Sequence, residues 1–357
     1  MAHLQPAETC MRTSLIVARR LPPLQSFARL ITAAHTRRSK SPREARVRPQ
    51  RTAIIPYVPT FHLRLQRRRA LAVAIAACLA ITCLHVDAAG RNFMWKATSP
   101  SHRVVYLVGS VHVLTPDYYP LDPAFDEAFK SSDVLVEELD MREMLGANSQ
   151  MEMLSRGMLP AGQTIDKVVS ADTMSAVVKK FSDLGMPLEP MKQFKPWLMS
   201  LILQGFEWQK SGFDADLGLD KHFYDQAIGA GKPVQGLETL AFQLSRFDEM
   251  SMATQDRLLS ETIKELDTTK TSFTRMADAW KTGDVPTIEQ LVLKDLKDEP
   301  QMYDRLLIER NRAWLPKIEA LFSRPKPAFV VVGAAHLVGQ DGLLQMLKAK
   351  GYTIEQL

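Results

Sequence analysis

The chain has 357 residues, of which 46% are apolar, so it can form one large domain or two small ones around a sizeable core. Its net charge of +5 is unevenly divided. Residues 1–88 contain 15 basic and three acidic residues, whereas residues 89–357 contain 30 basic and 37 acidic ones. The second part therefore lacks the basic face that nucleic-acid binding requires, and we expect no nucleic-acid partner.

All three cysteines, Cys10, Cys78 and Cys83, lie within the first 88 residues. The rest of the chain therefore contains no disulfide, no cysteine-ligated metal and no thiol nucleophile. This usage is compatible with an oxidising compartment.

The first part of the chain has the features of a leader. Residues 1–66 are rich in Arg and Pro without apolar periodicity, which indicates disorder or a start codon assigned too far upstream. Residues 67–88 combine three arginines, an apolar run over 70–86 and small residues, which is the pattern of a signal peptide. A membrane anchor is the alternative, although a bilayer span needs about 20 residues.

We therefore expect a periplasmic or secreted protein that touches a membrane only through this N-terminal segment. An organellar transit peptide is the other interpretation of the Arg-rich start.

Residues 93–357 have the pattern of a globular domain. Apolar runs at 104–108 and 134–136 are typical of strands buried on both faces. Between them, Asp122 is placed to cap a helix over 120–130. Strand, helix and strand in this short stretch predict a βαβ unit with parallel strands.

The end of the chain repeats this order. Residues 329–332 predict a strand, residues 341–350 a helix that ends at Gly351, and a closing strand follows. Between the two ends, about 190 residues show mainly helical periodicity, interrupted by a short strand at 233–237. We predict an α/β fold with a mixed, mainly parallel sheet flanked by helices and a large central helical insert. Strands 104–108 and 329–332 are expected to be neighbours.

Two Gly-x-x-His motifs follow the two terminal strands: Gly109-Ser-Val-His112 and Gly333-Ala-Ala-His336. Both histidines come just after the carboxyl end of a buried strand, the edge at which open α/β sheets form ligand crevices. Imidazole suits both proton transfer near neutral pH and metal binding. The alternative is that each histidine only caps its strand through a hydrogen bond.

Polar residues near the same edge extend the candidate site. Glu138 ends the second strand and can orient an imidazole, bind a metal or act as a general base. Glu137 points to the opposite face, and alternation alone does not decide which of the two faces the site. Glu238, Arg310 and Ser110 are candidates for substrate binding, Arg310 as an oxyanion or carboxylate partner.

These motifs together resemble the TraB/GumN family, which is related to the Tiki proteases and more distantly to erythromycin esterases and ChaN-like haem-uptake proteins. The resemblance covers about residues 93–357. It implies an α/β sandwich of the ChaN/erythromycin-esterase type, with both histidines and Glu138 in one cleft. The stretches that carry it are 107–113, 136–140, 236–239, 309–311 and 332–342.

The Tiki relatives imply peptide hydrolysis with a divalent metal, manganese or cobalt, with zinc as a further option. Two histidines and one carboxylate match a hydrolytic metal site in ligand type. We therefore expect a metal-dependent peptidase, acting on a peptide or small molecule, in which His112, His336 and Glu138 bind the metal and carry the catalysis. Two alternatives stay open: a metal-free esterase that uses His112 and Glu138, and a non-catalytic protein that binds a peptide or haem.

Overall fold

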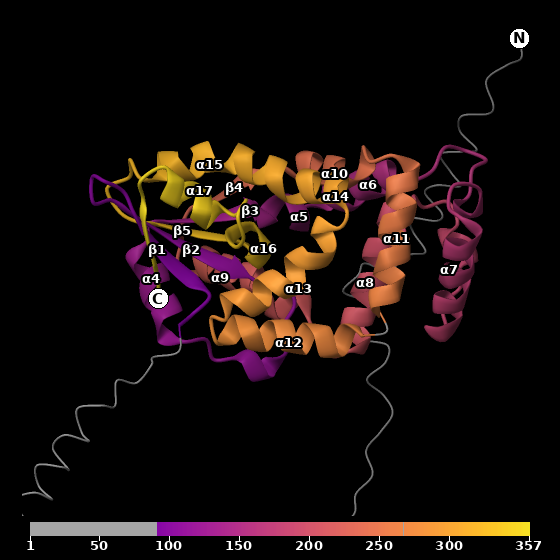
Figure 1. The fold of residues 1–357 in the computed structure, drawn as a ribbon, viewed down its shortest axis with the longest axis horizontal. Helices are drawn as coiled ribbons and strands as arrows, with labels where there is room; N and C mark the ends of the chain where they lie inside the picture. The colour runs from indigo at the N-terminus through magenta and orange to yellow at the C-terminus, as the bar shows by residue number, and fades with distance from the viewer. Residues whose placement is uncertain (1–90, 267) are drawn as a thin grey trace, which may run out of the picture. The chain divides into compact units, whose positions relative to one another are not determined.

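The computed structural model describes residues 91–266 and 268–357 (Figure 1). The predictions for a leader at 1–66 and for a signal peptide or anchor at 67–88 lie outside these described residues. Within the described part, none of the helices has the length and apolarity to cross a membrane.

A six-stranded sheet with the order β4-β3-β5-β2-β1-β6 forms the centre of the domain. Strands β2 to β5 are parallel, and β1 is antiparallel to both of its neighbours, β2 and β6. This confirms the predicted α/β fold with a mixed, mainly parallel sheet. The strands are β1 Met94–Thr98, β2 Val104–Ser110, β3 Val134–Leu139, β4 Val234–Glu238, β5 Ala328–Gly333 and β6 Thr353–Gln356.

The two strands that carry the Gly-x-x-His motifs are neighbours, as predicted. Strands β2 and β5 pair in parallel from Val105 opposite Ala328 to Ser110 opposite Gly333. The two strands of the first predicted βαβ unit, β2 and β3, are parallel but not neighbours. Strand β5 lies between β2 and β3, because the last βαβ unit inserts its strand into the middle of the sheet. Strand β1 was not expected from the sequence.

One face of the sheet is covered by α4 (Pro123–Ser131) and α9 (Leu219–Gly229). Asp122 caps α4 as predicted, because its carboxylate accepts the N–H of Ala124. The rings of Phe129 and Phe223 both contact Phe329 on β5, so aromatic packing fixes these helices to the sheet.

The other face carries α15 (Glu309–Leu321) and α17 (Leu343–Ala349), which are seen above the sheet in Figure 1. Helix α16 (Ala334–Leu337) follows the end of β5 directly. Gly351 follows α17 with a φ of 90°, the left-handed conformation that the sequence predicts there.

The predicted central insert is helical apart from β4. Helices α7, α8 and α11 form a second apolar core, separate from the core around the sheet, with Trp197, Leu203 and Phe181 among its buried side chains. The insert comprises α5 Met141–Leu145, α6 Ala147–Gly157, α7 Ala171–Asp183, α8 Pro196–Lys210, α9, α10 Leu240–Asp248, α11 Met252–Leu266, α12 Thr269–Lys281, α13 Val285–Lys297 and α14 Pro300–Tyr303.

Gly109 occupies a point at which only a glycine fits. Its carbonyl accepts a hydrogen bond from Trp280 Nε1 at 2.8 Å, and its N–H donates to the carbonyl of Phe93 at 3.0 Å. A Cβ added here would collide with the buried ring of Phe93 and lie 3.2 Å from Cα of Ala334. The close packing of this glycine therefore positions the loop that carries His112.

We predict that Gly109→Ala lowers the free energy of unfolding by about 1–3 kcal/mol, because the core cannot open for a methyl group. Gly205→Ala in α8 is the control: an added Cβ there meets no atom within 4 Å. This control is expected to raise stability by up to about 1 kcal/mol through helix propensity. Urea denaturation measures both, and equal stability of the two variants would contradict the packing argument.

Candidate functional site

The carboxyl ends of the parallel strands bring five of the predicted site residues together. His112 follows β2, Glu138 lies near the end of β3, Glu238 ends β4, and His336 lies in α16 directly after β5. Arg310 reaches the same place from the first turn of α15. The site therefore has the position in the sheet that the sequence predicts.

His112 is the exposed member of the histidine pair, with 58% of its side chain accessible. Its Nδ1 lies 2.8 Å from Oδ2 of Asp220, in the first turn of α9. The negative charge of Asp220 raises the pKa of His112 above its ordinary value of 6.5. With Nδ1 bonded to a carboxylate, Nε2 is the atom left for chemistry.

His336 is the buried member, with 5% of its surface exposed. Its Nε2 lies 3.0 Å from Nη1 of Arg310, and its Nδ1 lies 2.7 Å from Oδ1 of Asn311. A guanidinium only donates hydrogen bonds, so Nε2 accepts and the proton sits on Nδ1. Burial lowers the pKa of His336 to about 3, so this ring is neutral.

Arg310 is the cation at the centre of the site. Its Nε and Nη2 bind the carboxylate of Glu238 at 3.1 and 2.7 Å, and Nη2 also donates to Oε2 of Glu138 at 2.5 Å. Its Nη1 donates to His336 and, at 3.3 Å, to the carbonyl of Leu306 in the preceding π-helical turn. These bonds use all five N–H donors of the guanidinium.

Glu138 is a buried but ionised carboxylate. Its Oε1 accepts the backbone N–H of Gly333 at 2.6 Å, and its Oε2 is bound to Arg310. Burial raises the pKa of Glu138, but the charge of Arg310 and the hydrogen bond from the Gly333 N–H outweigh this effect, so the pKa falls well below its usual range.

Glu238 is held on both of its oxygens. Besides Arg310, its Oε2 accepts a hydrogen bond from Trp314 Nε1 at 3.0 Å. Burial raises the pKa of Glu238 against the opposing pull of Arg310. With every donor of Arg310 and both oxygens of Glu238 engaged inside the protein, these two residues form a support for Glu138 and His336. A direct contact of either with substrate stays a prediction.

Glu137 and Ser110 are buried and have no hydrogen-bond partner within the described part of the chain. Glu137 is 2% exposed on the opposite face of β3, and neither of its oxygens is bonded. Burial raises its pKa to about 9, so it is uncharged at neutral pH. The structure thus places Glu138, rather than Glu137, beside the histidines. The hydroxyl of Ser110 bonds none of the other site residues.

Gly333 lies where Glu138 and the two histidines come together. A Cβ added at Gly333 would lie 3.1 Å from Oε1 of Glu138, 3.5 Å from Nε2 of His112 and 3.7 Å from Cδ2 of His336. A side chain at this position would therefore crowd Oε1 of Glu138, and this oxygen and Nε2 of His112 lie near each other beside Gly333.

The three predicted metal ligands do not present a shared open position in this arrangement. Two of the needed atoms, Nε2 of His336 and Oε2 of Glu138, are bonded to the guanidinium of Arg310. Across residues 91–266 and 268–357, no group of three or more His, Cys, Asp or Glu side chains is placed to hold a metal ion. The residues thus match a metal site in type, but Arg310 would have to withdraw for a cation to bind them together.

Asp220 is the site residue that the sequence did not reveal. It lies 108 positions after His112, in the first turn of a helix, where an acid is ordinarily explained by the helix dipole. No spacing rule links such a residue to a strand end elsewhere in the chain.

The protein is thus an α/β protein whose candidate site combines two strand-end histidines, Glu138 and a buried arginine. The chain belongs to the TraB/PrgY/gumN family, whose model matches residues 93–356, so the resemblance seen in the motifs is confirmed. It is 26% identical over 265 residues to "Uncharacterized protein YbaP" of Escherichia coli (strain K12), covering 72% of this chain and 94% of that protein. The same protein of Shigella flexneri matches equally. No solved structure matches the chain.

We predict that Arg310→Met destabilises the protein by about 3–5 kcal/mol at pH 7, because it leaves two buried carboxylates without their cation. Arg324→Met is the control, since Arg324 pairs with Asp133 at 3.0 Å nearer the surface. That pair is expected to contribute less than about 1 kcal/mol. Urea denaturation of both variants measures the difference, and similar losses would contradict the central role of Arg310.

The loss caused by Arg310→Met is expected to shrink on acidification. A carboxyl whose pKa is lowered by folding contributes stability above its unfolded pKa of about 4.3 and loses it as the pH falls. Glu138 is such a group. The gap between wild type and variant should therefore narrow below about pH 4, whereas a gap that stays constant to pH 3 would argue against an ionised Glu138.

Proposed function

We propose that this chain is a hydrolase of ester or amide bonds in which His112 activates water at a metal-free site. The observation that carries this proposal is the position of Arg310. Its guanidinium bonds Glu138 and His336 through the atoms that a metal ion would need. The atoms that Arg310 does not bond are Nε2 of His112 and Oε1 of Glu138, and these suit acid–base chemistry.

His112 has the features of a general base. It is accessible, its Nε2 carries no hydrogen bond from the residues that the structure describes, and the carboxylate of Asp220 holds its Nδ1. Asp220 thereby fixes the tautomer whose lone pair is on Nε2, and it stabilises the imidazolium that forms when this atom takes a proton.

In this proposal the attacking water lies between His112 and Glu138. It donates one hydrogen to Nε2 of His112 and the other to Oε1 of Glu138, two atoms that lie near each other beside Gly333. In the proposed step Nε2 removes a proton while the water oxygen bonds to the carbonyl carbon. The carbon–oxygen or carbon–nitrogen bond then breaks, and the imidazolium returns the proton to the leaving group.

Arg310 and His336 have positioning roles in this scheme. Arg310 keeps Glu138 ionised and oriented within a buried setting, where an unpaired carboxylate would be protonated. His336 fills the neighbouring position as a neutral ring held by Asn311.

A metal-dependent peptidase is the second candidate, and one observation favours it. Both rings are bonded through Nδ1, His112 to Asp220 and His336 to Asn311, as histidines are oriented at metal sites. Binding through His112, His336 and Glu138 requires Arg310 to release two of these residues. The metal, whether manganese, cobalt or zinc, stays a prediction.

We predict that His112→Gln lowers kcat/KM at least about 100-fold by removing the general base. Activity is measured on a panel of p-nitrophenyl esters and fluorogenic peptides. The control is His102→Asn, an exposed histidine with a φ of 60°, which asparagine tolerates. Turnover that survives in the His112 variant would remove this residue from the mechanism. Saturable ligand binding without turnover across the whole panel would favour the non-catalytic alternative.

The pH profile tests the pairing of Asp220 with His112. Because Asp220 raises the pKa of His112, the imidazole stays protonated beyond pH 6.5 and the basic form appears only at higher pH. We expect kcat/KM to rise with pH to a midpoint above 6.5. In Asp220→Asn the midpoint should move to lower pH and the plateau should fall. An unchanged midpoint would show that Asp220 acts only on the fold.

Chelation distinguishes the two candidates. We expect activity after dialysis against EDTA to stay within about twofold of its starting value, and elemental analysis to find no stoichiometric metal, because no step depends on a bound cation. Loss of activity on chelation, restored by manganese, cobalt or zinc, would establish the metal-dependent peptidase instead.

A further inference from the structure

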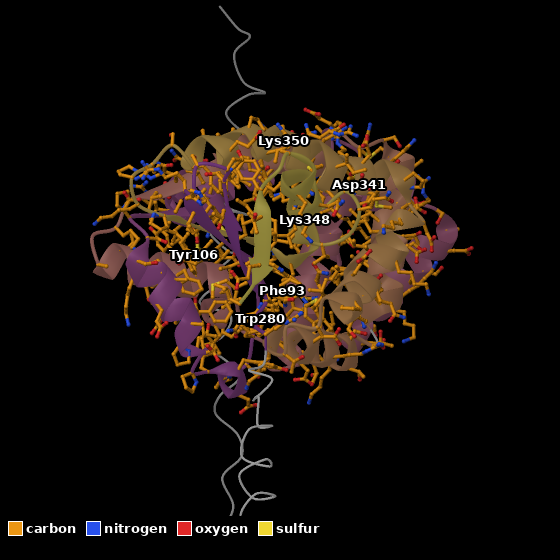
Figure 2. All side chains as sticks on the ribbon, turned by 60° about the vertical axis from the view of Figure 1, so that its left-hand side comes forward. Phe93, Tyr106, Trp280, Asp341, Lys348 and Lys350 are labelled. Atoms are coloured by element: carbon orange, nitrogen blue, oxygen red, sulfur yellow. The ribbon has the colours of Figure 1, made fainter. Side chains whose placement is uncertain are left out.

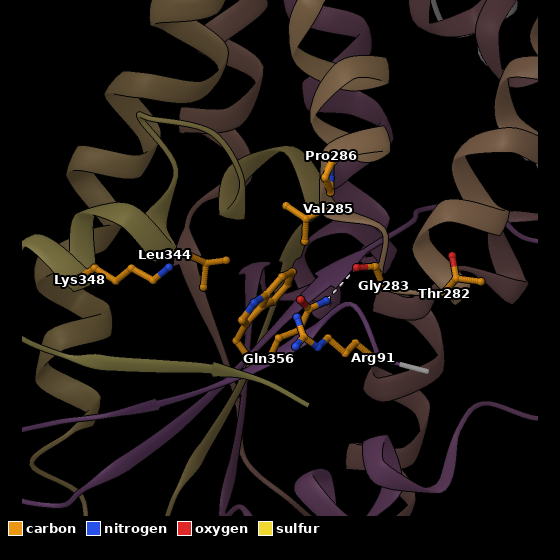
Figure 3. Close-up of a pocket in the computed structure, with 9 residues that line it drawn as sticks. Arg91, Thr282, Gly283, Val285, Pro286, Leu344, Lys348 and Gln356 are labelled. Carbon is orange, nitrogen blue, oxygen red and sulfur yellow. Dashed lines mark hydrogen bonds between the residues drawn. The ribbon is translucent and has the colours of Figure 1, made fainter. Parts of the chain in front are cut away.

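A cavity of about 770 Å³ lies at the edge of the sheet that is formed by β1 and β6 (Figure 3). None of the residues of the candidate site lines it. Strands β1 and β6, helix α17 and the turn between α12 and α13 form its walls. Its volume is in the range of small-molecule sites, about 300–1,000 Å³. None of its lining residues takes part in the proposed hydrolysis.

The inner wall of the cavity is apolar. Trp95, Val285 and Leu344 are among its lining residues. The indole is fixed by an edge-to-face contact with Phe93, with ring centroids 4.8 Å apart and planes at 83°. Such a surface binds an apolar chain or ring by removing it from water.

The charged residues that line the cavity are both cationic. Of the nine lining residues, Arg91 and Lys348 are basic and none is acidic. Among the described residues, neither forms an ion pair, whereas Lys350, two positions further along the chain from Lys348, is paired with Glu319 at 2.8 Å. Figure 2 labels Lys348 and Lys350 at separate points. A cavity lined by Arg91, Lys348 and apolar side chains is complementary to a ligand with an anionic head and an apolar body.

The walls are held in place without a ligand. The side-chain amide of Gln356 donates to the carbonyls of Asn92 and Gly283 at 3.0 and 2.9 Å, which ties β6 to the α12–α13 turn. Gly283 has a φ of 65°, and an added Cβ there would collide with the carbonyl of Arg91. A preformed cavity binds without first having to order its walls.

We propose that this cavity is a second ligand site, distinct from the catalytic site, for an amphipathic carboxylate: one anionic group held by Arg91 and Lys348, and an apolar chain or ring against Trp95. The proposal does not depend on the hydrolase mechanism, because it shares no residue with it.

The test is isothermal titration calorimetry, in which decanoate is added to the purified full chain. Decanol and decyltrimethylammonium supply the same chain without a charge and with the opposite charge. We expect saturable decanoate binding with a Kd below about 1 mM, and at least about tenfold weaker binding of the other two compounds. Equal binding of all three compounds, or no saturable binding of decanoate, would overturn the proposal.

Two double variants, each of which removes two positive charges, test where the anionic group binds. Arg91→Gln with Lys348→Gln in one chain is expected to weaken decanoate binding at least about tenfold. The matched control combines Lys350→Gln with Lys96→Gln: Lys96 is next to Trp95 on β1 but on the opposite face. This control should change Kd less than about twofold. Equal effects of the two double variants would show non-specific charge attraction and refute the site.

The position of the ligand's apolar chain is tested by fluorine NMR of protein labelled with 5-fluorotryptophan. The fluorine signal assigned to Trp95 by its loss in Trp95→Phe should shift on addition of decanoate, while the signals of Trp197 and Trp314, which are buried elsewhere, should not. A Trp95 signal that stays in place at saturation would place the ligand outside this cavity.

Discussion

The arrangement of the site depends on one buried guanidinium. Arg310 joins α15 to the ends of three strands, because its five donors reach Glu138 on β3, Glu238 on β4 and His336 after β5. Two carboxylates buried side by side repel each other and favour protonation unless a cation lies between them. With Arg310 in place, Glu138 stays charged at a depth where a lone carboxylate would be neutral, as Glu137 on the other face of the same strand is. Neighbouring residues of identical chemistry therefore differ in charge because only one faces Arg310.

Much of the fold follows from local patterns in the sequence. The continuous apolar runs become β2, β3 and β5, Asp122 caps α4, and Gly351 takes the left-handed conformation after α17. Such features depend on a few adjacent residues, so the sequence is sufficient to predict them. The order of the strands depends on which apolar surfaces pack best across the whole domain. For that reason the insertion of β5 between β2 and β3 could not be read from the chain.

The site, like the fold, could be predicted from the sequence only in part. That His112, His336 and Glu138 meet follows from the rule that parallel strands end at one edge of the sheet. Which atoms of these residues are free does not follow from spacing. Arg310 was expected to bind substrate, but its donors are all engaged by the protein, and this can only be seen once Leu306 and Glu238 are located around it. Asp220 was missed for a related reason: its contact with His112 is made across 108 residues by a helix end.

The two histidines show most clearly how surroundings decide chemistry. Both occupy the last position of a Gly-x-x-His motif after neighbouring parallel strands, and the sequence treats them alike. The partner on Nδ1 separates them: the carboxylate of Asp220 favours a positive ring on His112, whereas the neutral amide of Asn311 does not. The partner on Nε2 completes the difference, because Arg310 occupies this atom in His336 and leaves it free in His112. Burial then keeps His336 neutral, while exposure lets His112 exchange protons with solvent. A duplicated motif thus yields one exposed ring with a free Nε2 and one buried neutral ring, and the two could act as equal metal ligands only if Arg310 released His336.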